Sequence, residues 1–101
     1  MILTERIAIY IPAKYPGIVR LARQQLAQAA GGSTAHLAYG GWINNEGKYE
    51  TEDVYVVEAW YNMPHDDLVR SVATTIKDML LAAGEQAVAY ETEGTMHVVT
   101  Q

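Results

Sequence analysis

Residues 31–61 constrain the fold most, because they contain two strand-like segments joined by a short polar tip. Residues 34–43 and 49–61 each place alternate side chains on opposite sides, as a β-strand does. The tip between them, Asn44 to Lys48, is rich in residues that tolerate a positive φ. The stretch therefore predicts a long antiparallel hairpin.

The flanking segments alternate between strand and helix patterns. Period-two spacing predicts a strand over residues 3–11, which Pro12 and Pro16 end, and helical spacing predicts helices over residues 16–30 and, from an N-cap at Asn62, up to Gly84. Two short strands, residues 86–91 and 95–100, follow on either side of a turn. This order predicts one α+β domain, residues 1–101, with a ferredoxin-like βαββαβ fold extended by a C-terminal strand. Two helices are expected on one face of an antiparallel sheet.

Composition and charge exclude several classes of function. The 101 residues include no cysteine, so no disulfide, thiolate nucleophile or sulfur-ligated metal is expected. A net charge of −5 argues against a nucleic-acid partner. The acids Glu50, Glu52 and Asp53 alternate between the two faces of a strand, so no metal site is expected there, and no motif indicates a cofactor. Without a signal peptide or an apolar span, a cytoplasmic protein with no membrane contact is expected.

Both faces of the predicted sheet carry apolar rows. In residues 49–61, Tyr55 and Val57 belong to one row, whereas Val54, Val56 and Trp60 belong to the other. A sheet with helices on one face usually has one polar row per strand. The second apolar face predicts a homo-oligomer, in which another copy of the chain covers it. The alternatives are a monomer whose second face stays hydrated, and a face that is covered by a ligand or a different protein.

One spaced motif lies in the hairpin: Gly32-x-Thr34 is followed by Gly40-x-Trp42-x4-Gly47-x4-Glu52. Over these residues the chain resembles a family of small bacterial and phage-associated ferredoxin-like proteins of unknown function. The resemblance implies the fold and no particular activity. In architectural terms, Gly40 and the next glycine permit a bulge or close approach beside Trp42, and Glu52 accepts a hydrogen bond from the indole or a backbone amide. In functional terms, Trp42 and Glu52 line a ligand pocket.

These observations predict a non-catalytic, homo-oligomeric binding module. Its ligand is either a small molecule at a subunit interface or a partner protein, such as a host protein bound by a phage accessory protein. The residues expected to form the ligand-binding or interface surface are Trp42, Tyr39, Tyr55, Tyr61 and Glu52.

The alternative prediction is a small cofactor-free enzyme of the dimeric α+β type. His36 then pairs with Glu58 or Glu52 as the acid–base group, since a histidine beside a carboxylate exchanges protons near neutral pH. His65 and His97 are expected to be structural or surface residues.

Overall fold

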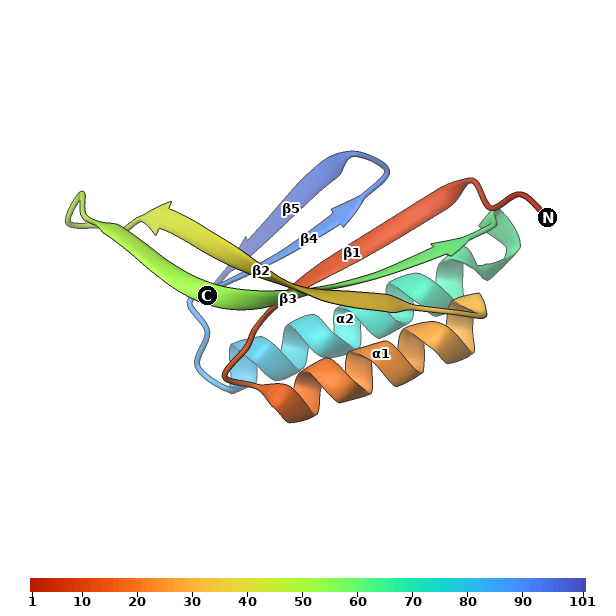
Figure 1. The fold of residues 1–101 in the computed structure, drawn as a ribbon, viewed down its shortest axis with the longest axis horizontal. Coiled ribbons are helices and arrows are strands. Elements are labelled where there is room, and N and C mark those ends of the chain that lie inside the picture. Colours follow the sequence, from red (N-terminus) through yellow and green to blue (C-terminus); the bar gives the residue numbers. More distant parts are fainter.

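A five-stranded antiparallel sheet with two helices on one face makes up the structure, a computed structural model that describes residues 1–101 (Figure 1). The elements along the chain are β1 (Glu5–Pro12), α1 (Pro16–Ala30), β2 (Thr34–Ile43), β3 (Tyr49–Tyr61), a short 3-10 helix η1 (Met63–His65), α2 (Asp66–Ala82), β4 (Ala87–Thr92) and β5 (Thr95–Thr100). The strand order is β2-β3-β1-β4-β5, so β2 and β5 form the two edges. The predicted α+β class is confirmed.

The helix ends follow from local chemistry. Pro16 occupies the first turn of α1, where its missing N–H needs no partner, and Gly31 ends the helix at a φ of 100° that favours glycine. The predicted N-cap at Asn62 is found in position only, since Asn62 is the N-cap residue of the short helix η1 and not of α2. Asn62 makes no capping hydrogen bond, and residues 63–65 form η1 before α2 begins at Asp66.

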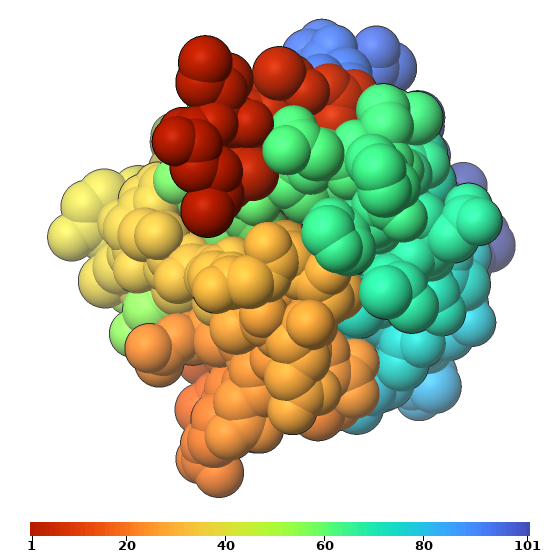
Figure 2. Space-filling view, turned by 90° about the vertical axis from the view of Figure 1, so that its right-hand side faces the viewer, coloured from red at the N-terminus to blue at the C-terminus, as the bar shows by residue number.

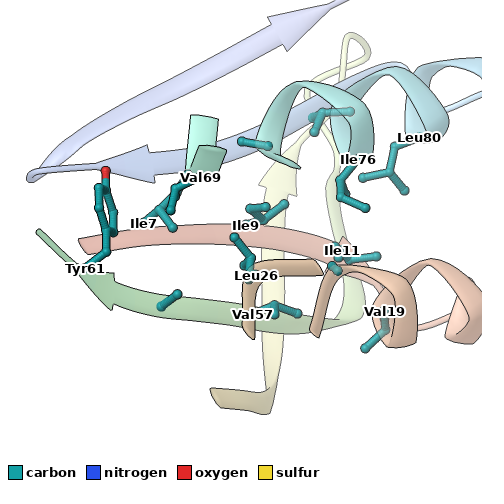
Figure 3. Close-up of a cluster of buried hydrophobic side chains, with 14 residues drawn as sticks. Ile7, Ile9, Ile11, Val19, Leu26, Val57, Tyr61, Val69, Ile76 and Leu80 are labelled. Atoms are coloured by element: carbon teal, nitrogen blue, oxygen red, sulfur yellow. The ribbon is translucent and has the colours of Figure 1, made fainter. Parts of the chain in front are cut away.

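The core lies between the helices and the middle of the sheet (Figure 3). Ile7, Ile9 and Ile11 of the central strand β1 are almost completely buried there, against residues such as Leu26 of α1 and Ile76 of α2. Burial of this apolar surface is the main force that holds the two layers together.

The β2–β3 hairpin is much longer than the helices that cover it. β3 has 13 residues and spans roughly 43 Å at the usual strand rise, whereas the 15 residues of α1 span roughly 22 Å. The hairpin therefore projects beyond the ends of both helices in Figure 1, and the molecule is 47 Å long. We call this projecting part, residues 39–53, the arm. Neither helix is both long and apolar enough to cross a bilayer.

Candidate functional site

A groove of about 400 Å³ lies at the end of the sheet opposite the arm, and we call it the N-terminal groove. Figure 2 looks onto this end, where the N-terminal segment (red) and the residues after α1 (orange to yellow) border a hollow. The lining residues come from the N-terminus, the α1–β2 connection and β3: Met1, Leu3, Ala30, Gly31, Gly32, Ser33, Thr34, Glu58, Ala59 and Trp60. The groove thus combines an apolar floor with one carboxylate and one indole.

Some residues that line this groove have backbone N–H groups without a hydrogen-bond partner. β2 begins at Thr34, opposite Glu58, so the last residues of β3 have no strand neighbour on that side. The N–H groups of Gly32 and Ser33 make no hydrogen bond within the protein. They are therefore donors that a ligand in the groove can use.

The side chain of Asn62 fixes the N-terminal wall of the groove. Its Oδ1 accepts hydrogen bonds from the backbone N–H and the hydroxyl of Thr4, at 3.2 and 3.3 Å, and its Nδ2 donates to the carbonyl of Ile2 at 3.2 Å. Asn62 consequently holds the segment before β1, instead of capping a helix.

A cluster of three charged residues lies on the face of the sheet that the helices leave open. Arg6 of β1 donates from Nε to Glu58 of β3 at 2.9 Å, and its other guanidinium nitrogens contact Glu58 and Glu91 of β4. Each of the three side chains is about a quarter exposed. Partial burial acts to lower the pKa of Arg6, but the hydrogen bonds to both carboxylates raise it overall. One guanidinium and two carboxylates leave the cluster with a net charge of −1.

Glu58 belongs to both features, since it lines the N-terminal groove and bonds to Arg6. Both of its hydrogen bonds from Arg6 end on Oε2, so Oε1 has no partner in the protein. Next to it in the groove, Trp60 is half exposed. A carboxylate beside an indole, in a cluster whose net charge is −1, suits an organic cation.

The sequence-predicted binding residues do not gather in one place. Tyr61 is buried, and its hydroxyl donates to Asp66 at 3.0 Å; burial, then this hydrogen bond, raises the pKa of Tyr61 to about 12. Tyr55 is half-buried under α1. Tyr39 and Trp42 are exposed on opposite faces of the arm.

The predicted packing around Trp42 is not found. The β2–β3 register runs unbroken through Gly40 and Gly41, and no hydrogen bond joins Trp42 to Glu52. Instead the ring of Tyr49 lies over Gly41, where a Cβ atom would come within 2.5 Å of the tyrosine oxygen. The close approach that this glycine permits is therefore to Tyr49.

Glu52 lies near a second polar cluster, at the far end of β1. There Tyr15 donates to Glu85 at 2.8 Å, and Lys14 lies 3.3 Å from the same carboxylate oxygen. Desolvation, followed by repulsion from Glu85, raises the pKa of Glu52. None of these residues lines the N-terminal groove.

His36 is exposed on the open face and makes no hydrogen bond or ion pair with any carboxylate. It pairs with Val56, so it is a diagonal neighbour of Glu58, a relation that places the two backbones about 7–8 Å apart. Glu52 is four residues further along β3 from Val56, roughly 13 Å, which is beyond hydrogen-bond reach. Of the two predicted pairs, only His36 and Glu58 are close enough for a side-chain rotation to bring them into contact.

Sequence reasoning missed Arg6, Glu91 and Asn62. Arg6 did carry a signal, because a lone cation inside an apolar strand needs partners on its neighbours. Which neighbours supply them depends on the strand order, since β4 joins β1 only after the chain has crossed α2.

No protein-family model matches this chain, and no curated protein matches it. Among solved structures, it is similar to a phage SAM lyase in complex with S-methyl-5'-thioadenosine, with a TM-score of 0.68 and 11% identity over 100% of this chain and 95% of that one. It is also similar to a phage SAM lyase in its apo state, with a TM-score of 0.61 and 9% identity over 98% of this chain and 90% of that one. A third similar structure is that of a Bacillus cereus protein related to NIF3, with a TM-score of 0.60 and 14% identity. The match covers 87% of this chain but 24% of that one.

At these identities the likeness shows a shared fold. It also corrects the expectation of a non-catalytic binding module, because structures that share this fold over nearly their whole length are of an enzyme. The alternative prediction, a small enzyme, agrees better with the comparison.

Proposed function

We propose that this protein is a lyase that cleaves a carbon–sulfur bond of S-adenosylmethionine, or a close sulfonium analogue, and releases S-methyl-5'-thioadenosine. The observation that carries the proposal is the whole-length match to the phage SAM lyase that binds this thioether nucleoside. The strand order further supports a ferredoxin-like βαββαβ arrangement in which β5 is added beside β4.

The reaction breaks the bond between the sulfonium sulfur and the γ-carbon of the methionine part. The electron pair of that bond goes to sulfur, which becomes a neutral thioether. The γ-carbon then forms a new bond in one of two ways. The substrate's own carboxylate attacks it to give a lactone, or a base removes a β-proton and the electrons of that C–H bond form an alkene between the β- and γ-carbons. In either case the leaving sulfur needs no proton, so no general acid is required there.

The N-terminal groove fits such a substrate in size and charge. Its volume of about 400 Å³ is within the usual range for small-molecule sites, about 300–1,000 Å³. The free oxygen of Glu58 and the ring of Trp60 supply attraction for the sulfonium or the ammonium group. The unpaired N–H groups of Gly32 and Ser33 supply donors for the carboxylate or the purine.

The surrounding groups also suit the transition state. The positive charge on sulfur disperses as the bond breaks, and an apolar wall such as Leu3 and Ala59 favours a dispersed charge over a concentrated one. Arg6 is a positioning residue that fixes the carboxylate of Glu58 through two hydrogen bonds. If a proton is removed, the candidate base is His36, a diagonal neighbour of Glu58 that does not line the groove and whose side chain would have to rotate toward it.

Incubation of the purified protein with S-adenosylmethionine tests the proposal, with the products separated by liquid chromatography and identified by mass. We expect S-methyl-5'-thioadenosine to accumulate in proportion to enzyme and time. A folded protein that forms none above the blank contradicts the proposed function.

Two variants then test the location. Glu58→Gln and Trp60→Ala are expected to reduce kcat/KM by at least about tenfold, the effect of losing one good charged or stacked contact. Glu50→Gln and Trp42→Ala are matched controls, because these residues lie on the same open face but in the arm. If turnover falls in the two control variants and not in the Glu58 or Trp60 variants, the site lies in the arm. The proposed reaction is not contradicted by that result.

A further inference from the structure

The arm carries an apolar stripe with nothing packed on it. Tyr39 is 84% exposed, Tyr49 70% and Ile43 65%. The register pairs Ile43 with Tyr49 and Tyr39 with Asp53, so these side chains share the side of the sheet that bears the helices. The helices end before they reach this stripe (Figure 1). Exposed clusters of large apolar side chains usually mark an interface.

The arm is built to keep its shape without a partner. The Asn44 carboxamide oxygen accepts from the N–H groups of Glu46 and Lys48, at 2.9 and 3.0 Å. Behind this tip, the ring of Tyr49 rests on Gly41. A preformed surface loses little conformational entropy on binding, which favours association.

At the root of the arm, on the same side, lies a second groove of about 310 Å³ that we call the arginine groove. It is lined by Pro16, Val19, Arg20, Arg23, Ala35 and Tyr55. Arg20 and Arg23 are exposed and form no ion pair. Asp53, on the apolar side of the arm, is exposed and likewise unpaired.

We propose that a second copy of this chain binds here, with the arm of each copy in the arginine groove of the other and Asp53 facing Arg20 and Arg23. Each molecule carries both halves of the contact: apolar side chains with a carboxylate, and a groove with two cations. A twofold axis lets both contacts form together. A buried tyrosine contributes about 150–250 Å², so the reciprocal contact covers on the order of 1,000 Å² or more, the size of a stable interface.

The open face is a weaker candidate for this contact. At its centre, Ala8 and Val56 are already buried, and the ion cluster of Arg6, Glu58 and Glu91 lies beside them. The second copy is thus assigned to the arm. This inference is independent of the proposed lyase activity, because none of its residues lines the N-terminal groove.

Sedimentation at micromolar concentration tests the proposal. We expect the wild-type chain to sediment above the 11.2 kDa of one copy. Asp53→Arg alone, and Arg20→Glu with Arg23→Glu, are each expected to weaken association by about tenfold or more, whereas all three changes in one chain restore it. Met96→Glu with Val98→Glu on β5 is the control and is expected to change nothing.

Two results overturn the proposal: a wild-type monomer throughout this range, or an assembly that survives the single-sided charge reversals and is lost in the β5 control. A covalent test does not depend on affinity. The chain has no cysteine, so Tyr39→Cys with Arg23→Cys is expected to give a disulfide-linked pair of chains on oxidation, whereas Met96→Cys with Arg23→Cys stays single. The reverse pattern also contradicts the arm contact.

Discussion

The two ends of β3 both carry a tyrosine on the side of the sheet that bears the helices, yet the two tyrosines differ completely in environment. Near the C-terminal end of the strand, Val57, Ala59 and Tyr61 are buried beneath the helices. Near its start, Tyr49 continues the same alternation and is exposed. The difference shows that alternation identifies the face of a strand, while helix length decides how much of that face is covered.

Loss of a core side chain under the helices should have the largest effect of all. Ile9→Ala removes a fully buried side chain from the central strand. The free energy of unfolding of the variant is expected to be lower than that of the wild type by about 2–5 kcal/mol. Ile43→Ala, in the arm, is the matched control and is expected to stay within about 0.5 kcal/mol when the chain is dilute. Denaturant unfolding of both variants measures the contrast. Equal losses would mean that the arm is packed against something within the single chain.

The comparison also explains what the sequence could predict. The helix over residues 16–30, the hairpin and the last strand follow from local spacing and turn residues, and the structure has them at those positions. The arm was predictable by arithmetic, because the strand pattern is about twice as long as either helix pattern. The Arg6 cluster was not, since it joins β1, β3 and β4 through a strand order that no local pattern contains.

The predicted site residues differ in environment in the same way. Tyr39, Trp42 and Tyr61 are similar in chemistry, yet one is buried under α2 and the other two lie on opposite sides of the arm. Periodicity placed them on faces but did not say which positions along the strand the helices cover. The N-terminal groove depends on the segment before β1 and on Asn62, whose role as a tether has no sequence signature.

Removal of Arg6 should have the next largest effect. Arg6→Met leaves Glu58 and Glu91 close together and partly buried without a cation, so a loss of about 1–3 kcal/mol is expected at neutral pH. Lys48→Met in the arm, which breaks a 3.9 Å pair between exposed groups, should change nothing measurable. Denaturant unfolding measures both variants, and a loss for Arg6→Met no larger than that for Lys48→Met would contradict this explanation.

Tyr61 should give a smaller effect with a distinctive pH dependence. Tyr61→Phe removes the hydrogen bond to Asp66 and is expected to cost about 1 kcal/mol. The folded protein holds the pKa of Tyr61 at about 12, above its ordinary 10.0, so the protonated hydroxyl stabilises the fold. That contribution is complete below the ordinary value and is lost as the pH rises from there to about 12.

Denaturant midpoints across this alkaline range should therefore fall less steeply for Tyr61→Phe than for the wild type. Tyr39→Phe, in the arm, is the control and should keep the wild-type slope, because Tyr39 is exposed in the folded chain. If both variants have the same slope as the wild type, the alkaline loss comes from other groups.

The smallest effect is expected at the end of β3, where the covered half of the strand meets the N-terminal groove. Asn62→Ala removes three hydrogen bonds between exposed groups, so stability should fall by no more than about 1 kcal/mol. The segment before β1 should nevertheless loosen, and under the proposed function KM should rise more than kcat falls, because a wall of the groove is lost while Glu58 stays in place. Faster amide exchange at Leu3 and Thr4 measures the loosening directly, and Asn45→Ala at the tip of the arm is the control. Unchanged exchange at these residues would mean that packing of Leu3, and not Asn62, holds the segment.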